Sequence, residues 1–327
     1  MSIEVAVKHI LTYTLTARIP ASMKGNMAKT GTRALSVGGG KGGTGKSCFT
    51  ANIGYALARR GKKVILVDTD FEGANLHTFV GISYPKQTLD DYFRSSTKNI
   101  EEIILPTPVS GLRLISAPNN LISLSGPNYV ERQRFYRAVM NIDADIIIFD
   151  VSAGSGMRVI DYFSIAPVMV LMLEPVPTAL ENAYGFLKNF FCRHLLRSFY
   201  SDKPAHRIIL DVMSDKNSRS DNALKDLLAI LDRRSHEKTE QFRTYISSLK
   251  HIYLVVNKVR TREQREVIDR FARIVKRYLM LNLRAGGALP LEPEMDKSIT
   301  ERTPFIQQNP EGTYAQAMDE IIINLSF

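Results

Sequence analysis

The chain has 327 residues, 44% of them apolar and 23% charged, and no uncharged apolar run of the roughly 18 residues that a membrane-spanning helix needs. These figures exclude a disordered protein and an integral membrane protein. The two cysteines, Cys48 and Cys192, lie far apart and in no CxxC or Cys/His cluster. This argues against a disulfide framework, a structural zinc and an iron–sulfur site, and we expect a cytoplasmic protein.

The charge of the chain is unevenly distributed. The whole sequence carries 43 Lys and Arg against 33 Asp and Glu, formally +10, and residues 188 to 280 account for 21 of the basic and 11 of the acidic side chains. The remainder is balanced, with 22 of each sign. An excess of this size suits nucleic acid, an anionic membrane surface or phosphate ligands. The alternative is a solvated helical face, because acidic residues are interleaved with the basic ones.

The first 33 residues differ from the rest and are expected to form an N-terminal arm. A mildly apolar stretch from Ile3 to Leu15 is interrupted by Lys8 and His9. A signal peptide would place its charges before an unbroken apolar core, so an amphipathic helix or a disordered arm fits better. An N-terminal membrane anchor remains an alternative for this arm.

Apolar strands and helical patterns alternate from Ala34 onward. Near-continuous Val, Ile and Leu strands between helices indicate a doubly wound α/β domain, with a mostly parallel sheet covered by helices on both faces. We expect one such domain over residues 34 to 327. The predicted strands are 34–39, 63–68, 112–116, 146–149, 168–173 and 252–256, and the predicted helices are 46–60, 131–140, 178–196 and 263–281.

The segment from about 199 to 250 breaks this alternation. It is polar, charged and mostly helical, and we expect a basic helical insertion outside the sheet, formed by a pair of helices. Four aromatic residues at its start are better explained as core residues at helical spacing than as a surface for a partner protein: Phe190, Phe191, Phe199 and Tyr200.

The most informative motif is GKGGTGKS, from Gly40 to Ser47, between a predicted strand and a predicted helix. It matches the P-loop pattern G-x-x-x-x-G-K-[ST]. Glycines let successive backbone N–H groups turn inward around phosphate oxygens, and the helix N-terminus adds its positive end. Lys46 would reach the β- and γ-phosphates of a nucleotide, and the Ser47 hydroxyl would bind Mg²⁺.

Two aspartates follow buried strands where a ligand of such a sheet lies. Asp70 closes the sequence VDTD after one strand, and Asp150 closes the apolar strand DIIIFD. Carboxylates at the carboxyl ends of parallel strands face the ligand crevice. Asp150 has the form of a Walker B aspartate, which holds the Mg²⁺ shell. A turn or helix-capping role is the alternative for Asp70.

With these motifs the chain resembles the MinD/ParA family of deviant Walker A ATPases, a group that includes Mrp-type and flagellar-number regulators. The family loop K-G-G-x-x-K-[ST] reads here from Lys41 to Ser47, and the likeness covers roughly residues 35–185 and 252–325. It implies that Lys41 reaches a partner subunit's nucleotide and that Asp70 positions the attacking water. It also implies an adenine contact from Asn257 in YLVVNK, and a switch II segment after Asp150. Ser152 stands there where proline is usual.

The residues and the resemblance together predict one site. The catalytic residues would be Lys41, Lys46 and Asp70, and the Mg²⁺ ligands Ser47 and Asp150. The nucleotide would be bound by Gly40, Lys41, Gly42, Gly43, Thr44, Gly45, Lys46, Ser47, Cys48 and Asn257.

The resemblance implies a slow ATPase that forms an ATP-dependent homodimer and is stimulated by a protein partner, with ATP and Mg²⁺ as its ligands. Such a switch would position a division site, a flagellum or another cargo. The alternative is a partition ATPase that binds DNA non-specifically through residues 188 to 280. An Mrp-type cluster carrier is disfavoured by the missing CxxC. The C-terminal sequence YAQAMDEIIINLSF is acidic, so the basic membrane helix of MinD-like members is not expected here.

Overall fold

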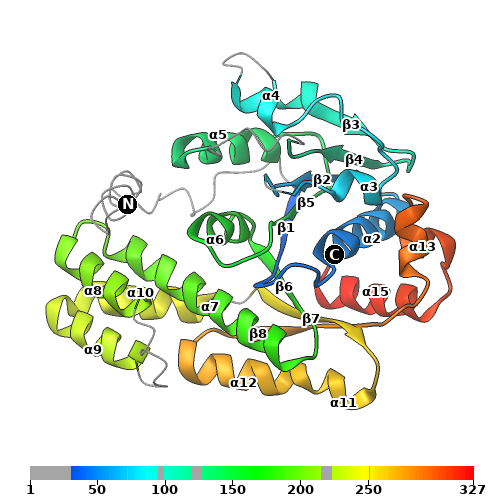
Figure 1. Ribbon diagram of the computed structural model, residues 1–327. Coiled ribbons are helices and arrows are strands. Elements are labelled where there is room, and N and C mark those ends of the chain that lie inside the picture. Colours follow the sequence, from blue (N-terminus) through cyan, green and yellow to red (C-terminus); the bar gives the residue numbers. More distant parts are fainter. Residues whose placement is uncertain (1–30, 72, 95–98, 119–126, 215–222, 250) are drawn as a thin grey trace.

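The computed structural model describes residues 31–71, 73–94, 99–118, 127–214, 223–249 and 251–327, and it is built around one sheet of eight strands (Figure 1). The strand order is β3-β4-β2-β5-β1-β6-β7-β8, and β3 alone pairs antiparallel to its neighbour. The strands are β1 (Arg33–Gly38), β2 (Val64–Asp68), β3 (Ile104–Pro106), β4 (Leu112–Ile115), β5 (Ile146–Asp150), β6 (Val168–Leu173), β7 (Ile252–Val259) and β8 (Leu283–Pro290).

Helices cover both faces of the sheet. One face packs against α5, α6, α7 and α12, and the other against α2 and α15 (Figure 1). The helices are α2 (Lys46–Arg59), α3 (Leu76–Phe79), α4 (Leu89–Arg94), η2 (Ile100–Ile103), α5 (Tyr129–Met140), α6 (Met157–Phe163), α7 (Pro177–Ser198), α8 (Lys203–Ser214), α9 (Ala223–Arg234), α10 (His236–Ser248), α11 (Arg262–Arg265), α12 (Val267–Leu279), α13 (Met295–Thr300), α14 (Phe305–Gln308) and α15 (Thr313–Asn324).

The composition of the strands explains this layering. In β2, Ile65 and Val67 pack into the core on the α5–α7 face, while Val64 and Leu66 pack into the core on the α2 face. All five residues of the strand are buried. A parallel strand buried on both sides needs apolar residues at every position, which is the pattern that the sequence has. The predicted doubly wound fold is confirmed.

Two strands were not predicted from the sequence. β3 has only three residues, and β8 contains Arg284, Gly286 and Gly287, so neither carries the apolar run that marks a strand. β8 ends with Leu289 and Pro290. The first strand begins one residue earlier than expected, at Arg33.

The insertion contains three described helices, α8, α9 and α10, and the predicted pair is therefore wrong. Ser235 lies between α9 and α10 and separates what reads as one helical pattern. The predicted helix over 263–281 is likewise divided into α11 and α12. Phe190, Phe191 and Phe199 are fully buried, which confirms that they belong to the core, whereas Tyr200 is half-buried and is not part of it.

The two ends of the chain bear on the membrane alternatives. The predicted arm falls on residues that lie almost wholly outside the described part of the chain. At the other end, α15 buries Tyr314, Met318 and Ile321 against the sheet and is the closing helix of the core. Among the described helices, none combines the length and the apolar character needed to cross a membrane.

Candidate nucleotide-binding site

The loop from Gly40 to Gly45 connects β1 to α2, and its first and last residues are packed too closely for a side chain. A Cβ on Gly40 would lie 2.2 Å from the carbonyl oxygen of Asn182, and a Cβ on Gly45 would lie 2.3 Å from Nδ2 of Asn257. Gly45 also has φ +88°, a conformation that favours glycine. The backbone therefore runs directly into the N-terminus of α2, where its N–H groups can hold an anion.

Lys46 is the first residue of α2 and is 8% exposed. Its Nζ lies 3.5 Å from the carbonyl oxygen of Lys41, so the side chain folds back over the loop. Burial lowers the pKa of Lys46, and the carboxylates of Asp150 and Asp70 oppose that effect. A buried ammonium group beside a glycine-rich loop can neutralise phosphate, as the sequence predicts.

Asp150 closes β5 and is 2% exposed. Its Oδ1 lies 3.3 Å from the Thr50 hydroxyl, and the Ser47 hydroxyl also hydrogen-bonds to it. Burial raises the pKa of Asp150 to about 6, although both hydroxyls and Lys46 lower it. The structure thus brings the two predicted Mg²⁺ ligands, Ser47 and Asp150, together. Hydroxyl and carboxylate oxygens are the ligands that Mg²⁺ prefers, so the residues fit this ion.

Asp68 was not among the predicted site residues, and it lies beside Asp150. The two aspartates are register partners at the ends of β2 and β5. Burial and the charge of Asp150 raise the pKa of Asp68 well above its ordinary value. Its Oδ1 accepts the backbone N–H of Asp70 at 2.9 Å and its Oδ2 that of Leu76 at 3.3 Å. Asp68 therefore holds both ends of the loop that carries Asp70.

Asp70 is partly exposed at the mouth of this cluster. Its charge acts on both Lys46 and Asp150, which places it at the same edge of the sheet. Its Oδ1 accepts the backbone N–H of Gly73 at 3.1 Å. The adjacent Thr69 donates its backbone N–H and its hydroxyl to the carbonyl oxygen of Asp150, at 2.9 and 2.8 Å. The predicted water-positioning loop is thus joined to the predicted Mg²⁺ site.

Of the remaining predicted residues, some are exposed on the loop and one has its side chain packed against another residue. Lys41, Gly42 and Gly43 are exposed on the outer side of the loop. The Cys48 sulfur lies 3.3 Å from the Met295 sulfur, and burial raises its pKa to about 12. The Cys48 side chain is therefore used in packing, and only its backbone is available to the predicted phosphate site.

Asn257 is buried against the loop, and its Nδ2 donates to the carbonyl oxygen of Thr44 at 2.9 Å. The next residue, Lys258, donates to the carbonyl oxygen of Gly43 at 3.0 Å and to Glu174 at 2.7 Å. The Lys258–Glu174 pair was not predicted from the sequence, because its members are far apart in the chain. The adenine contact of Asn257 stays a prediction.

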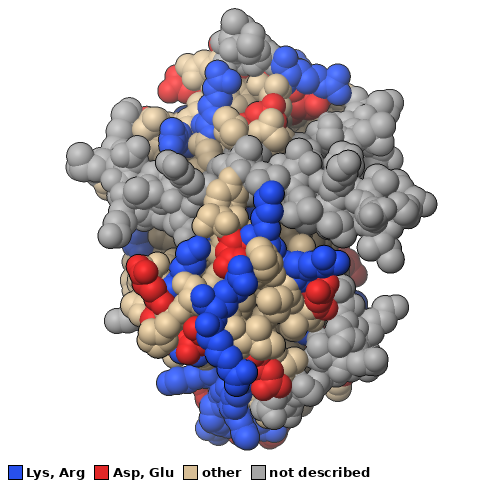
Figure 2. All heavy atoms as spheres, turned by 90° about the vertical axis from the view of Figure 1, so that its left-hand side faces the viewer, with Lys and Arg blue, Asp and Glu red and all other residues tan. Residues whose placement is uncertain are grey.

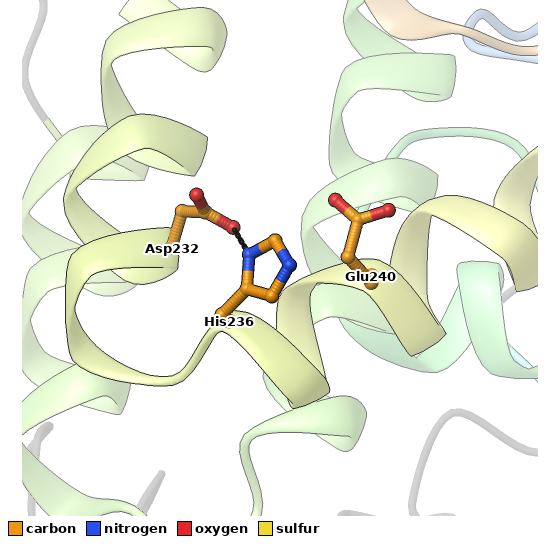
Figure 3. A group of neighbouring side chains, drawn as sticks. All are labelled: Asp232, His236 and Glu240. Carbon is orange, nitrogen blue, oxygen red and sulfur yellow. Dashed lines mark hydrogen bonds and ion pairs between the residues drawn. The ribbon is translucent and has the colours of Figure 1, made fainter.

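A second group of possible metal ligands lies far from this loop along the chain, in the insertion (Figure 3). Asp232, His236 and Glu240 bring their ligand atoms within 4.8 Å of one another, and His236 Nδ1 lies 3.0 Å from Asp232. The Arg243 guanidinium is 3.6 Å from Asp232 and also pairs with Glu240. Because Arg243 pairs with both carboxylates and His236 with one of them, we interpret this group as a network of surface ion pairs.

The fold and the loop define a P-loop nucleotide-binding protein. The chain matches the family described as the CobQ/CobB/MinD/ParA nucleotide binding domain over residues 35–305. It belongs to this family, and the resemblance noted in the sequence is confirmed.

The relatives agree with this assignment. The chain is 30% identical to the antiactivator FleN of Pseudomonas aeruginosa, over 47% of this chain and 55% of that protein. It is also 30% identical to the flagellum site-determining protein YlxH of Helicobacter pylori, over 49% and 54%. The chain therefore spans about half the length of these relatives.

Solved structures share the fold at low identity. MinD from Pyrococcus horikoshii, complexed with Mg-ADP, superimposes with a TM-score of 0.58 at 18% identity, over 89% of this chain and 94% of that one. A ParA family ATPase from Chlorobium tepidum has the same score at 17% identity, over 90% and 100%.

Proposed function

We propose that this protein hydrolyses ATP and acts as a nucleotide-gated dimeric switch. The observation that carries the proposal is the convergence of the Gly40–Gly45 loop, the buried Lys46 and three carboxylates at one edge of the sheet. The carboxylates are Asp68, Asp70 and Asp150. One buried lysine does not balance the two buried carboxylates of Asp68 and Asp150, so this edge suits a divalent cation bound together with a nucleotide.

Each residue then has a defined task. The loop N–H groups and Lys46 bind the β- and γ-phosphates, and Ser47 and Asp150 hold Mg²⁺. When bound, Mg²⁺ neutralises charge on the phosphate oxygens. Asp70 orients a water for attack on the γ-phosphate, and Asp68 keeps the Asp70 loop in place. Lys41 lies exposed on the loop, where it is available to the nucleotide of a second subunit.

The cellular task we propose is the spatial regulation of a structure such as a flagellum or a division site. The names of the relatives FleN and YlxH, an antiactivator and a flagellum site-determining protein, support it. Slow turnover that a protein partner accelerates belongs to the same proposal, because a switch must persist in one state until its partner acts.

A partition ATPase that binds DNA is the second candidate, and one surface favours it. Figure 2 shows Lys and Arg side chains in a vertical band through the lower half of the face that carries α8, α9 and α10 in Figure 1. The described part of the insertion is nearly balanced, with 7 basic and 6 acidic residues. By contrast, residues 260–277, on α11 and α12, carry 7 exposed basic and 3 acidic residues. In the described chain, the basic surface therefore lies mainly on the helices after β7.

The switch is tested by Asp70→Ala. Without the water-positioning carboxylate, ATP should persist and hold two subunits together, so light scattering should give the mass of a dimer with ATP and of a monomer with ADP. The matched control is Asp226→Ala, at an exposed position of α9, which should behave as wild type. A monomer in both nucleotides would reject the switch mechanism.

The DNA alternative has a separate test. Contacts to phosphates should weaken steeply as salt rises. Replacing Arg273 and Arg277 with Ala should lower both the affinity and its salt dependence if DNA lies on α12. Binding that is independent of ATP, or unaffected by salt, would contradict a partition function.

A further inference from the structure

Asp161 of α6 is buried among three arginines that come from two other helices. Arg193 donates to it through Nε at 2.7 Å and through a second nitrogen at 2.8 Å. Arg197 lies 2.7 Å and Arg132 3.0 Å from the same carboxylate. All four side chains are at most 14% exposed. The arginines hold the pKa of Asp161 below its usual range against the effect of burial. We call these four residues the Asp161 cluster.

The cluster holds the segment that follows Asp150. The loop from Val151 to Gly156 leads directly into α6, and we refer to this loop and helix as switch II. On α7, Asn189, Arg193 and Arg197 are four residues apart and lie on one face of the helix. Asn189 donates to the carbonyl oxygen of Ser155 at 3.0 Å, and the two arginines bind Asp161. One face of α7 thus fixes both the loop and the helix of switch II.

Another part of α7 holds the insertion. Phe191 packs edge-to-face on Phe242 of α10, with ring centroids 4.9 Å apart, and both rings are fully buried. His194 lies between Ser164, at the end of α6, and Tyr245 of α10, at 3.3 and 3.1 Å.

The hydrogen bonds of His194 have one consistent direction. Ser164 donates its proton to the carbonyl oxygen of Ile160 at 2.7 Å, so it accepts from His194 Nε2. Tyr245 then donates to His194 Nδ1. This series of hydrogen bonds requires a neutral imidazole ring. Burial favours that form, because it lowers the pKa of His194 to about 3.

The same helix also reaches the P-loop. Asn182, in its second turn, places its carbonyl oxygen where a Cβ on Gly40 would be. With 22 residues, α7 is about 33 Å long. It therefore contacts the phosphate-binding loop, switch II and the insertion in succession (Figure 1).

We propose that Arg193 and Arg197 are positioning residues for switch II, which they bind through Asp161, so that α6, α7 and α10 move as one body and the insertion reports the nucleotide state. The inference rests on the proposed switch function. Separating α6 from α7 would leave buried charges unpaired, which is more costly than moving the two helices together. A movement of switch II on loss of the γ-phosphate is therefore transmitted to α10.

The test compares hydrogen exchange and kinetics in the full chain with Mg²⁺ and either ADP or a non-hydrolysable ATP analogue. In wild type, peptides of α10 should change their exchange between the two nucleotides, whereas α15, on the other face of the sheet, serves as the internal reference. Asp161→Asn should abolish most of this change. It should lower kcat about 10- to 100-fold through misplacement of switch II and leave KM for ATP within about threefold.

Two further variants keep the result interpretable. Asp202→Asn removes another aspartate–arginine pair of the insertion, 2.6 Å to Arg234, and should retain wild-type kcat and exchange. Asn189→Ala removes only the contact to the switch II loop, and it should lower kcat less than Asp161→Asn does. If Asp161→Asn does not fold, Asn189→Ala decides, and an unchanged kcat there overturns the proposal.

Failure of this inference is distinguishable from failure of the proposed function. A wild-type protein that neither binds nor hydrolyses ATP would reject the switch itself. A wild-type protein that hydrolyses ATP while α10 exchanges identically in both nucleotides would overturn only the coupling. A folded Asp161→Asn protein with wild-type kcat and exchange would do the same.

Discussion

Within the described residues, carboxylates are buried in two places, with opposite electrostatic consequences. At the sheet edge, Asp68 and Asp150 lie side by side with one buried lysine, and the pKa of both is raised. In the Asp161 cluster, one carboxylate meets three arginines and its pKa is lowered. The sheet edge has fewer positive than negative side chains, whereas the Asp161 cluster has three positive side chains for one carboxylate.

This difference separates a binding site from a structural connection. Two carboxylates buried side by side repel one another, and a ligand that supplies positive charge relieves this repulsion. The Asp161 cluster needs no such ligand for its carboxylate, since the guanidinium groups provide both charge and hydrogen bonds. We therefore expect substitutions at the sheet edge to impair function and substitutions in the Asp161 cluster to impair stability first.

The largest effect is expected from Lys41→Ala. In the proposed dimer this exposed lysine supplies charge to the γ-phosphate of the other subunit, a role comparable to that of an arginine finger, so kcat should fall by about 10³-fold or more. ADP binding should change little, because Lys46 and the loop backbone remain. Phosphate release and ADP titration measure the two effects. Lys62→Ala, at an exposed position before β2, is the control, and unchanged turnover of Lys41→Ala would place the chain among ordinary P-loop proteins.

The Asp161 cluster is expected to dominate stability. Asp161→Ala leaves three buried guanidinium groups without their carboxylate, and the free energy of unfolding should fall by about 3–5 kcal/mol. Urea denaturation followed by circular dichroism measures this loss. Asp202→Asn removes the charge of a more exposed pair and keeps an acceptor for the backbone N–H of Ala205, so it should cost about 0.5 kcal/mol. A loss below about 1 kcal/mol for Asp161→Ala would show that water reaches the cluster and compensates the arginines.

Removing a negative charge at the sheet edge should raise the stability of the protein, whereas removing Asp161 should lower it. The rise in the pKa of Asp150 from 3.8 to about 6 corresponds to about 3 kcal/mol. Without nucleotide and Mg²⁺, Asp150→Asn should therefore raise the free energy of unfolding by about 1–3 kcal/mol at pH 8. The same variant should lose most of its Mg²⁺-dependent ATP hydrolysis. A destabilised Asp150→Asn protein would contradict the view that this edge is short of cations.

The sequence predicted one of these regions and not the other, for a physical reason. The P-loop, Asp70 and Asp150 are recognisable because each follows a strand, and the carboxyl ends of parallel strands meet at one edge. Asp68 was missed because its role depends on a register partner. The Asp161 cluster joins residues 132, 161, 193 and 197, and nothing in their local patterns brings α5, α6 and α7 together. The excess charge was located correctly by segment, but exposure placed it mainly on α11 and α12.

The smallest expected effect is a pH dependence of stability that differs between the sheet edge and the Asp161 cluster. A group whose pKa is raised on folding binds more protons in the folded state than in the unfolded state. Protonation of Asp150 therefore raises the free energy of unfolding as the pH falls through about 6. Asp161, with its lowered pKa, contributes stability above 3.8 that is lost only below that value. Between pH 7.5 and 5.5, therefore, Asp150 responds and Asp161 does not.

A difference measurement isolates this response. The buried His194 acts in the opposite direction, because its pKa falls from 6.5 to about 3 on folding and acid favours the unfolded chain. Wild type and Asp150→Asn share that contribution, so it cancels in their difference. Without Mg²⁺, the stability advantage of Asp150→Asn should shrink by about 1 kcal/mol from pH 7.5 to pH 5.5, because the Asp68–Asp150 pair of the wild type takes up protons in this range. An advantage that does not change with pH would mean that Asp150 stays ionised in the folded protein, and that Lys46 and the two hydroxyls already satisfy it.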